Sequence, residues 1–492
     1  MKKCRLDKYK LDQNQTPLFN ATKDHINREV IPFYVPGHKH GIGLNELREY
    51  AGNKMLQMDL NCGKDIDFLS NPQGVIREAQ ELAAETFGAR EAFFLTNGTT
   101  SGIQAMIMSV CNPGEKILVP RNAHRSVVSA LIFSGAIPVY IQPQINYELG
   151  ISVGVNIDEI ERIINTQDIK AVFVINPSYY GHVSDLKKIV EIAHKNGIIT
   201  MTDEAHGSHM GFNENFPSSA MVCGADMSTM SIHKTAGAMT QASLLLFNSK
   251  LISSDKVFKV LNLLRSSSPS NLLLCSLDIA RKQLALKGDI LLQNALDLAR
   301  WARDEINTIP GLYAFGKELI GENCYGFDET KLGICVKEIG LTGFELDVIL
   351  REQYNIQIEL ADYNCIMCII SLGDTKLNLE ALVNALRDIS KKYRNKKNDI
   401  ELCIPSIPRM MISPREAFYC DKEIINFNDS IGYISGETIM CYPPGVPVIN
   451  CGELINKEIV NYILKLKNCK AELQGMSDST FETIQIIKKD VQ

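Results

Sequence analysis

Residues 228–243 read Ser-Thr-Met-Ser-Ile-His-Lys-Thr-Ala-Gly-Ala-Met-Thr-Gln-Ala-Ser, so that Lys234 directly follows a histidine in a run of small and hydroxylic residues. The apolar run 244–247 that comes next is typical of a buried strand. A free ammonium ion at a buried sheet is costly, whereas desolvation lowers the pKa of an amine and makes it nucleophilic. Lys234 is therefore a candidate for condensation with an aldehyde. The alternative is a solvated loop lysine between two strands.

A second motif combines a short strand, a turn and a helix start. Residues 91–95 predict a buried strand, and the turn Thr-Asn-Gly-Thr-Thr-Ser-Gly at 96–102 leads into an apolar helix. The exposed N–H groups and the dipole of a helix N-terminus favour an anion. The turn is therefore a candidate phosphate cradle, although threonine is also a common helix cap. Its occurrence upstream of Lys234 is what makes it informative.

Strands and helices alternate around these motifs. Apolar runs predict strands at 116–120, 137–141, 171–177 and 198–203, and helical patterns begin near 74 and 124 and cover 157–165 and 186–196. This alternation predicts an α/β fold with a largely parallel sheet and helices on both faces. Ligands of such sheets bind at the carboxyl ends of the strands.

An aspartate ends one of the predicted strands. Asp203 follows the run 198–202 and begins the stretch Asp-Glu-Ala-His-Gly-Ser-His at 203–209. An acid in this place is a helix cap, a metal ligand or the partner of a buried cation. A zinc site of Asp203, His206 and His209 is one alternative, but it leaves the lysine motif unexplained.

The pattern Ser-x-His-Lys, followed by small residues and Thr-Gln-Ala-Ser, resembles the cofactor-lysine signature of the ornithine/lysine/arginine decarboxylase family. The matching residues are Ser231, His233, Lys234, Gln241 and Ser243. The resemblance runs from about Pro17 to Glu453. Enzymes of this family use pyridoxal 5'-phosphate (PLP) and have the aspartate-aminotransferase fold, called fold-type I. The resemblance therefore implies a mainly parallel central sheet, a smaller α/β domain and a C-terminal α+β domain.

We expect four parts along the chain. They are an N-terminal arm with an entrance loop (1–60), a PLP-binding large domain (61–300), a small α/β domain (301–395) and a C-terminal decarboxylase domain (396–492). The first 16 residues are polar and predict a flexible start or a surface arm. In the small domain we expect strands at 332–336, 356–360 and 365–371 and helices at 343–353 and 378–394. The Tyr-Pro-Pro-Gly stretch from 442 resembles a rigid turn of the family.

The resemblance also assigns roles. Lys234 holds PLP covalently, and Asp203 pairs with the protonated pyridine nitrogen, which makes the ring a better electron sink. His233 or Lys234 protonates Cα after CO2 leaves. His124 is expected to stack on the cofactor ring, and the loop around Ser267 to serve a neighbouring subunit's site, although a plain loop and helix cap is the alternative. The whole implied cofactor set comprises Gly98, Thr99, Thr100, His124, Asp203, His206, Ser231, His233, Lys234 and Ser267, in which the role of His206 is open.

The implied substrate is a basic amino acid. The short chain and the form Asp-Glu-Ala-His-Gly most resemble the short arginine decarboxylases, which favours arginine to agmatine in polyamine biosynthesis, with lysine or ornithine as the alternative. The cationic end of the substrate needs a carboxylate partner, for which Glu437, Glu453 and Asp362 are the candidates. Transamination or elimination on the same fold is a rival, and a catalytically silent binding protein is a rival of another class.

Length, net charge and cysteine content limit the number of domains and the kinds of partner. The 492 residues predict two to three domains, and a net charge of −6 gives no reason to expect nucleic acid or an anionic membrane as partner. No apolar stretch approaches the roughly 18 residues of a membrane helix, so we expect a cytoplasmic protein. The family resemblance implies a homodimer or higher homo-oligomer with shared active sites. Among 14 cysteines, Cys365 and Cys368 have CxxC spacing. Their apolar surroundings favour buried thiols over a redox or zinc site, and no metal is expected.

Overall fold

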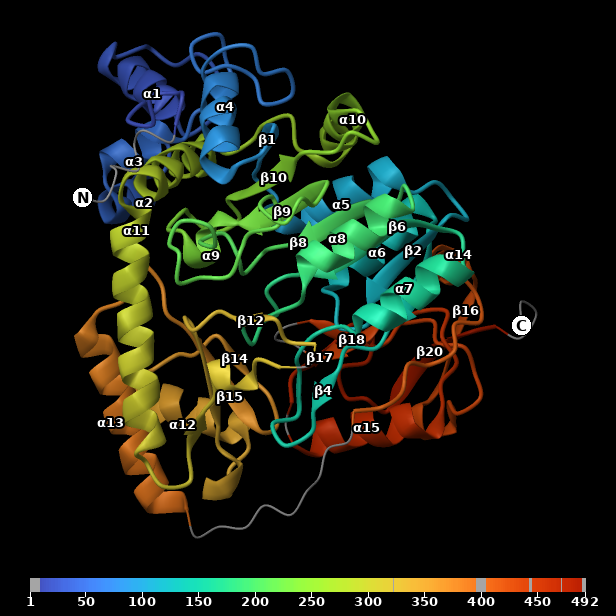
Figure 1. The fold of residues 1–492 in the computed structure, drawn as a ribbon. Coiled ribbons are helices and arrows are strands. Elements are labelled where there is room, and N and C mark those ends of the chain that lie inside the picture. Colours follow the sequence, from blue (N-terminus) through green and yellow to red (C-terminus); the bar gives the residue numbers. More distant parts are fainter. Residues whose placement is uncertain (1–8, 322, 395–403, 442–444, 470, 489–492) are drawn as a thin grey trace. The chain divides into compact units, whose positions relative to one another are not determined.

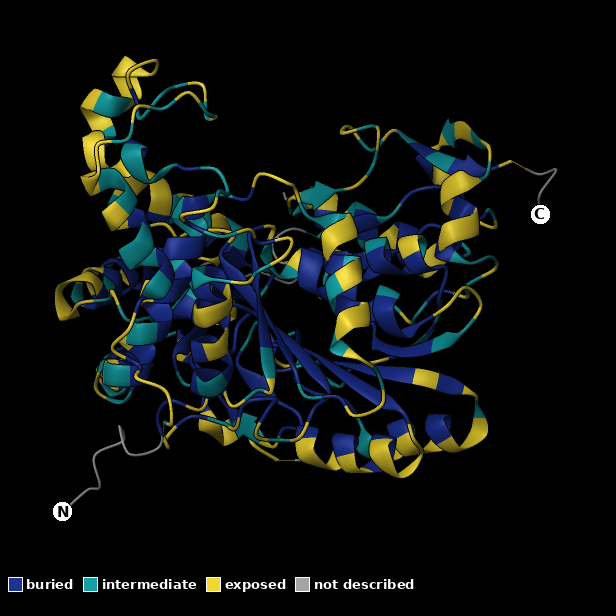
Figure 2. Ribbon diagram, turned by 90° about the horizontal axis from the view of Figure 1, so that it is seen from above, coloured by how far each residue is buried: buried dark blue, intermediate teal, exposed yellow. Residues whose placement is uncertain are grey.

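The computed structural model describes residues 9–321, 323–394, 404–441, 445–469 and 471–488 (Figure 1). The chain divides into two compact units. One consists of Met1–Ser109 with Met201–Gln293, and the other of Val110–Thr200 with Asn294–Gln492. In the view from above in Figure 2 the strands are mostly buried, and helices alternate between buried and exposed residues.

The first unit carries four strands of the central sheet. They are β1 (Glu91–Leu95), β10 (Ser243–Phe247), β9 (Met227–Ser231) and β8 (Ile199–Asp203), in that order. Strand β10 is antiparallel to β1 and β9, whereas β8 and β9 are parallel. Every residue of β8, β9 and β10 is buried, as the near-continuous apolar or small residues of central strands predict. The helices of this unit are α1 (Pro17–Asn27), α2 (Asn45–Ala51), α3 (Asn53–Met58), α4 (Val75–Phe87), α5 (Gly98–Val110), α9 (Ile232–Thr235), α10 (Ser254–Leu264) and the start of α11 (Asn271–Asn307).

Helix α5 lies unusually close to strand β9. A Cβ atom on Gly102 would lie 2.3 Å from Thr229 Oγ1 and 3.0 Å from Thr229 Cβ, so only glycine permits this approach. The contact fixes the N-terminus of α5 beside the strand that leads to Lys234.

The described segment before α1 is mostly exposed, as a surface arm would be, and it is tied to α11. Arg281 of α11 donates to the carbonyls of Gln13 (2.9 Å) and Gln15 (2.6 Å), and Asp278 accepts from the N–H of Leu18 (3.1 Å). Arg281 and Asp278 are themselves a buried ion pair. The backbone of the described residues from 9 onward is therefore fixed against α11, because its polar groups satisfy charges buried on that helix.

The second unit contributes the other strands of the central sheet. Strands β6 (Ile169–Ile175), β2 (Lys116–Pro120) and β3 (Ile137–Ile141) are parallel neighbours. Strand β8 spans the boundary of the units, and the seven-stranded sheet has the order β1-β10-β9-β8-β6-β2-β3. Helices α6 (Arg125–Ser134), α7 (Ile157–Thr166) and α8 (Leu186–Lys195) alternate with these strands. The predicted α/β fold with a mainly parallel central sheet is confirmed. Short pairs β4 (Ile145–Asn146) with β5 (Ile151–Ser152), and β7 (His182–Val183) with β12 (Gly326–Phe327), lie outside this sheet.

A smaller antiparallel sheet follows α11. Its order is β11 (Tyr313–Ala314), β13 (Lys331–Cys335), β15 (Cys365–Ile369) and β14 (Leu360–Ala361), and helices α12 (Gly343–Tyr354) and α13 (Lys376–Tyr393) accompany it. Single 3₁₀ turns lie at Lys317–Leu319 and Lys337–Ile339. The strand predicted at 356–360 is wrong except for its last residue. Asn355 ends α12 in the left-handed conformation (φ 56°), and the N–H of Ile356 bonds back to Leu350, which directs the chain away from ladder geometry.

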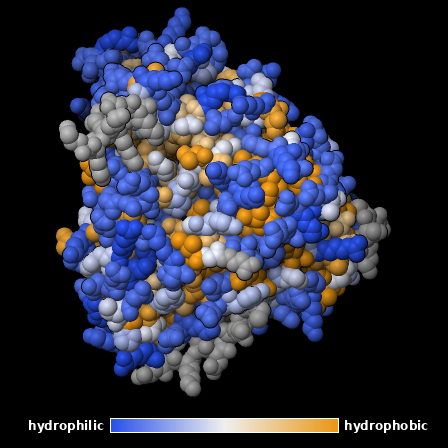
Figure 3. All heavy atoms as spheres, viewed as in Figure 1, coloured by the Kyte–Doolittle hydropathy of each residue, from blue (hydrophilic) through white to orange (hydrophobic). Residues whose placement is uncertain are grey.

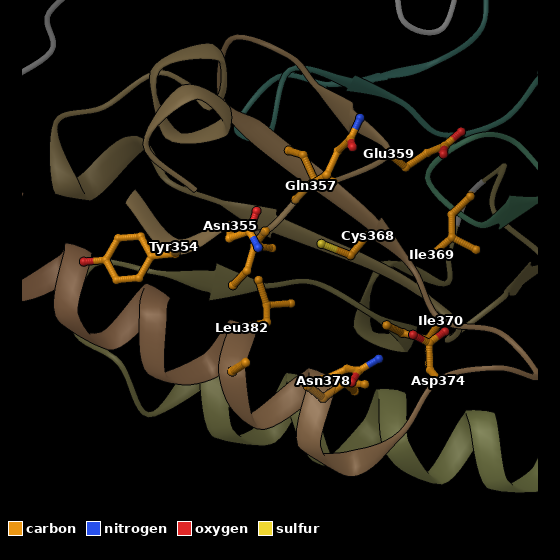
Figure 4. A pocket seen from close by; sticks show the side chains of 14 residues that line it. Tyr354, Asn355, Gln357, Glu359, Cys368, Ile369, Ile370, Asp374, Asn378 and Leu382 are labelled. Carbon is orange, nitrogen blue, oxygen red and sulfur yellow. The ribbon is translucent and has the colours of Figure 1, made fainter. Parts of the chain in front are cut away.

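The residues after α12 line a cavity of about 680 Å³ instead. Figure 4 shows Asn355, Gln357 and Glu359 on one side of it, with Cys368 of β15 and Asn378 of α13. None of the residues with a predicted role lines this cavity.

The C-terminal part of the second unit is α+β. It contains α14 (Pro414–Tyr419), β16 (Lys422–Asn426), a 3₁₀ turn (Phe427–Asp429), β17 (Ile439–Cys441), β18 (Val446–Ile449), α15 (Lys457–Asn468), β19 (Leu473–Gln474) and β20 (Thr483–Ile487). Residues 442–444 of the predicted Tyr-Pro-Pro-Gly turn lie outside the described residues. Throughout the described parts of the chain, no helix has the length and apolar character that crossing a membrane requires, and hydrophilic residues are interspersed with hydrophobic ones on the face drawn in Figure 3.

Candidate active site

Lys234 lies on a single helical turn between two buried strands. Strand β9 ends at Ser231, and the turn α9 (Ile232–Thr235) carries the lysine before the chain returns as β10. The small residues that follow let the loop turn sharply, with Gly237 at φ 86° and Gln241 at φ 78°. Lys234 Nζ is 2.9 Å from Nε2 of His206. The lysine is thus directed towards the carboxyl end of the neighbouring strand β8.

Asp203 is the last residue of β8 and is buried. Its Oδ1 accepts from the N–H of Ala205 at 2.9 Å. Burial raises the pKa of the Asp203 carboxyl, while the bond from Ala205 and the positive charge of Lys234 oppose that rise. Asp203 and His206 are buried and Lys234 is half-buried, and the charge of Lys234 acts on Asp203 from the end of the neighbouring strand.

The candidate phosphate cradle adjoins the lysine loop. Helix α5 begins at Gly98 (φ 68°), whose N–H donates to the carbonyl of Gln241 at 3.0 Å. Ser231 Oγ donates to Thr99 Oγ1 at 3.4 Å. No atom lies within 4 Å of a Cβ built on Gly98. The cradle thus has open space, a helix N-terminus and two hydroxyl groups beside the turn that carries Lys234.

His233 faces a carbonyl group. Its Nδ1 lies 3.1 Å from the carbonyl oxygen of Ala242, and because a carbonyl only accepts, Nδ1 carries the proton. Burial lowers the pKa of His233. The imidazole is therefore neutral at pH 7, with its lone pair on Nε2.

Sequence reasoning gave no role to Glu204, the residue after Asp203. Its side chain is fully buried and accepts from the N–H of Ala220 (2.7 Å) and from Ser228 Oγ (2.5 Å). Burial raises the pKa of Glu204 to about 7. An acidic pair at the end of a buried strand is the only signal that could have drawn attention to it.

The two histidines of the alternative zinc site make separate contacts. His206 bonds Lys234, whereas His209 Nδ1 lies 3.0 Å from Thr235 Oγ1. Across the described ranges, no group of three or more His, Cys, Asp or Glu side chains could hold a metal ion. Cys365 and Cys368 are free thiols, and burial raises the pKa of Cys368 to about 12.

The remaining predicted cofactor residues are Thr100, Ser267 and His124. Thr100 is in the first turn of α5, and Ser267 is exposed in the loop before α11, where Ser266 Oγ accepts from the N–H of Ser268 at 3.1 Å. His124 belongs to the second unit, where it caps α6 by accepting from the N–H of Ser126 at 3.2 Å. Their cofactor roles stay predictions.

The three candidate partners for a cationic side chain also lie in the second unit. Glu453 forms a buried bidentate pair with Arg121, at 2.5 and 2.8 Å. Asp362 accepts from Tyr180 OH and from the N–H of Cys365 (2.7 Å), and burial raises its pKa to about 6.

Glu437 differs from the other two because it lines a cavity. Its Oε1 accepts from the N–H and the hydroxyl of Ser477, and its Oε2 accepts from the N–H of Gln485 at 3.1 Å. The cavity, of about 550 Å³, is also lined by Arg125 and Lys422.

The first unit therefore offers what PLP requires: an amine for its aldehyde, a helix N-terminus with hydroxyls for its phosphate, and a buried carboxylate for its pyridinium nitrogen. This combination, on a mainly parallel sheet, defines a PLP enzyme of fold-type I. Comparison with known proteins narrows the class. Residues 16–378 match the major domain of Orn/Lys/Arg decarboxylases, and residues 398–485 match their C-terminal domain. The chain belongs to this family, and it is a decarboxylase that uses PLP.

Individual relatives cover nearly the whole chain. The chain is 44% identical to the arginine decarboxylase of Halalkalibacterium halodurans, over 97% of this chain and 98% of the relative. It is 42% identical to the arginine decarboxylase of Bacillus subtilis, over 97% and 99%. Among solved structures, the constitutive lysine decarboxylase of Escherichia coli has the same fold, with a TM-score of 0.83 and 20% identity, covering 97% of this chain and 82% of that chain.

Proposed function

We propose that this protein decarboxylates arginine to agmatine and CO2. The observation that carries the proposal is the 42–44% identity to curated arginine decarboxylases over almost the full length of each chain. The lysine decarboxylase of similar fold is only 20% identical. The proposed setting is the cytoplasm, and the proposed pathway is polyamine biosynthesis.

PLP has a defined set of ligands in this proposal. Lys234 holds it by its amine, and Asp203 pairs with its pyridinium nitrogen. The N-terminus of α5 with Thr99, Thr100 and Ser231 would hold its phosphate, and the family resemblance would give His124 a place against its ring. When bound, the cofactor supplies an electron sink for the negative charge that the departing CO2 leaves at Cα. Burial of Asp203 removes competing water and keeps this electrostatic pairing strong.

The proton for Cα comes from Lys234 rather than His233. His233 donates its one proton, on Nδ1, to the carbonyl of Ala242, and its lowered pKa disfavours a second proton. Lys234 is the remaining candidate of the two, since an ammonium group has three protons to donate. His233 instead helps to hold the loop that follows the lysine.

Glu437 is the proposed acceptor for the substrate's guanidinium group. Glu453 already has a bidentate partner in Arg121, and Asp362 is occupied by Tyr180 and by backbone N–H groups. Glu437 also accepts from Ser477 and from the N–H of Gln485, but it lines a cavity of about 550 Å³. A bidentate guanidinium–carboxylate pair gives charge-assisted bonds of about 1.5–3 kcal/mol each.

The active form is a homodimer in this proposal. The exposed loop 266–268 is available to a second copy, and the family resemblance assigns such a loop to the neighbouring subunit's phosphate.

The test is a competition assay. Purified protein is given arginine, lysine and ornithine at equal concentration with PLP, and CO2 and amine products are quantified. We expect agmatine as the main product. Cadaverine or putrescine as the main product would overturn the substrate assignment, and a keto acid in place of an amine would overturn decarboxylation itself.

A further inference from the structure

Lys234 and His206 form a close pair of nitrogen bases. The 2.9 Å between Lys234 Nζ and His206 Nε2 is a hydrogen-bonding distance. His206 is only 3% exposed, and it extends from the loop after β8, whereas Lys234 comes from the turn after β9. Two elements separated in sequence thus place a second base directly against the reactive amine.

The chemistry of the two groups fixes the direction of the bond. An ammonium group has three donors and no acceptor, so Nε2 of His206 must accept and His206 must be neutral when Lys234 is charged. An ammonium nitrogen has no lone pair and cannot attack a carbonyl carbon. Lys234 must therefore lose a proton before it can condense with an aldehyde, and the group already bonded to that proton is His206.

We propose that His206 is the base that takes this proton. The Nζ–H bond breaks, the electron pair stays on Nζ, and the proton forms a bond to Nε2. The neutral amine then condenses with the aldehyde: a C=N bond replaces C=O, and the carbonyl oxygen leaves as water with the two hydrogens of the amine. The identity of the aldehyde as PLP rests on the proposed function, whereas the proton transfer does not.

His209 provides a matched control on the same loop. It is also buried, but its Nδ1 faces Thr235 Oγ1 at 3.0 Å, and its ring packs edge-on against Phe216 with the ring centroids 4.9 Å apart. Replacing His209 removes a buried imidazole next to the same turn without removing the contact to Lys234 Nζ. An effect specific to His206 is therefore separable from general loosening of the loop.

The first experiment measures the reactivity of Lys234 without PLP. Cofactor-free wild type and the variants H206Q, H206F and H209Q are treated with formaldehyde and cyanoborohydride between pH 6 and about pH 10. The rate of methylation at Lys234 is measured by mass spectrometry, relative to the exposed Lys250. Glutamine can accept the hydrogen bond but cannot take the proton, so H206Q isolates proton transfer from positioning. Circular dichroism identifies any variant that fails to fold.

We expect H206Q and H206F to slow methylation of Lys234 at pH 7 by at least about tenfold, a bound set below the roughly 100-fold at which general acid–base effects typically begin. The difference in methylation rate between the His206 variants and wild type should disappear towards pH 10, where amines deprotonate in bulk solvent. H209Q should match wild type at every pH. A wild-type rate in both His206 variants at pH 7 would overturn the proposal. So would a deficit of equal size at every pH, which would indicate a structural role.

The second experiment separates this inference from the proposed function. The same proteins are mixed with PLP, and the rate of appearance of visible absorption is followed. Slow uptake in H206Q but not in H209Q supports the base role towards PLP. If wild type takes up no PLP while the methylation result holds, the cofactor assignment fails and the proton transfer stands.

Discussion

Replacing Gly102 by alanine should weaken PLP binding from a distance. The added Cβ would lie 2.3 Å from Thr229 Oγ1 and 3.0 Å from Thr229 Cβ. Rotating the Thr229 side chain cannot relieve the second contact, because its Cβ is fixed to strand β9. Helix α5 must therefore move away from the sheet by roughly 1 Å to regain normal contact distances. Overpacking of this kind costs about 1–3 kcal/mol, against about 1 kcal/mol gained from alanine's helix propensity.

The shift moves the N-terminus of α5, which we propose as the phosphate cradle. A displacement of about 1 Å takes N–H groups out of hydrogen-bonding range, and each bond to a charged group is worth about 1.5–3 kcal/mol. We therefore expect the Kd for PLP to rise at least about tenfold in G102A, measured by titration of visible absorption. The double variant G102A/T229A should recover part of the affinity, because it removes the nearest contact. G373A is the control, since a Cβ on Gly373 meets nothing within 4 Å. Wild-type PLP affinity in G102A would refute the assignment of the cradle.

Three other outcomes follow from the site. The pKa of Glu204 is raised to about 7 in the folded protein. Between about pH 4.5 and 7 the folded state therefore holds a proton that the unfolded state has released. Glu204's contribution to the free energy of unfolding falls as pH rises through that window. E204Q should therefore gain thermal stability relative to wild type from pH 5 to pH 8, by up to about 3 kcal/mol, and a pH-independent difference would contradict the buried acid. E437Q should lower kcat/KM for arginine at least about tenfold, or roughly 1.4 kcal/mol, while PLP binding is kept. E453Q breaks the pair with Arg121 and should instead lower Tm. Equal kcat/KM in E437Q and wild type would exclude Glu437 as the partner of the guanidinium group. Mixing inactive K234A with a variant damaged at Ser266–Ser268 should restore some activity through hybrid dimers, and continued inactivity despite demonstrated subunit exchange would argue against shared sites.

Local sequence signals were sufficient for much of the central sheet. The predicted strands at 91–95, 116–120 and 137–141 have the same bounds as β1, β2 and β3, because each is a short apolar run ended by polar or turn-forming residues. The strand predicted at 356–360 is wrong for a local reason that the residue types alone do not reveal. A left-handed asparagine at 355 ends α12 and redirects the alternating sequence Ile-Gln-Ile-Glu-Leu, which otherwise reads as a strand.

Contacts between distant residues were beyond sequence reasoning. The polar residues before α1 looked like a surface arm because their partners, Asp278 and Arg281, lie on a helix more than 250 residues later in the chain. That Asp203 and Lys234 lie at the carboxyl ends of neighbouring strands was predictable, since Asp203 ends the buried run of β8 and Lys234 follows that of β9. The contact of His206 with Lys234 depends on the course of two loops, which no spacing rule fixes.

The most direct test of the account is to locate the cofactor chemically. Wild-type protein is saturated with PLP, reduced with borohydride, digested and mapped by mass spectrometry. The account predicts loss of the visible absorption and a phosphopyridoxyl group on Lys234, with no label at this position in folded K234A. A label on a different lysine, or a wild-type protein that remains colourless and unlabelled after PLP is added, would contradict it.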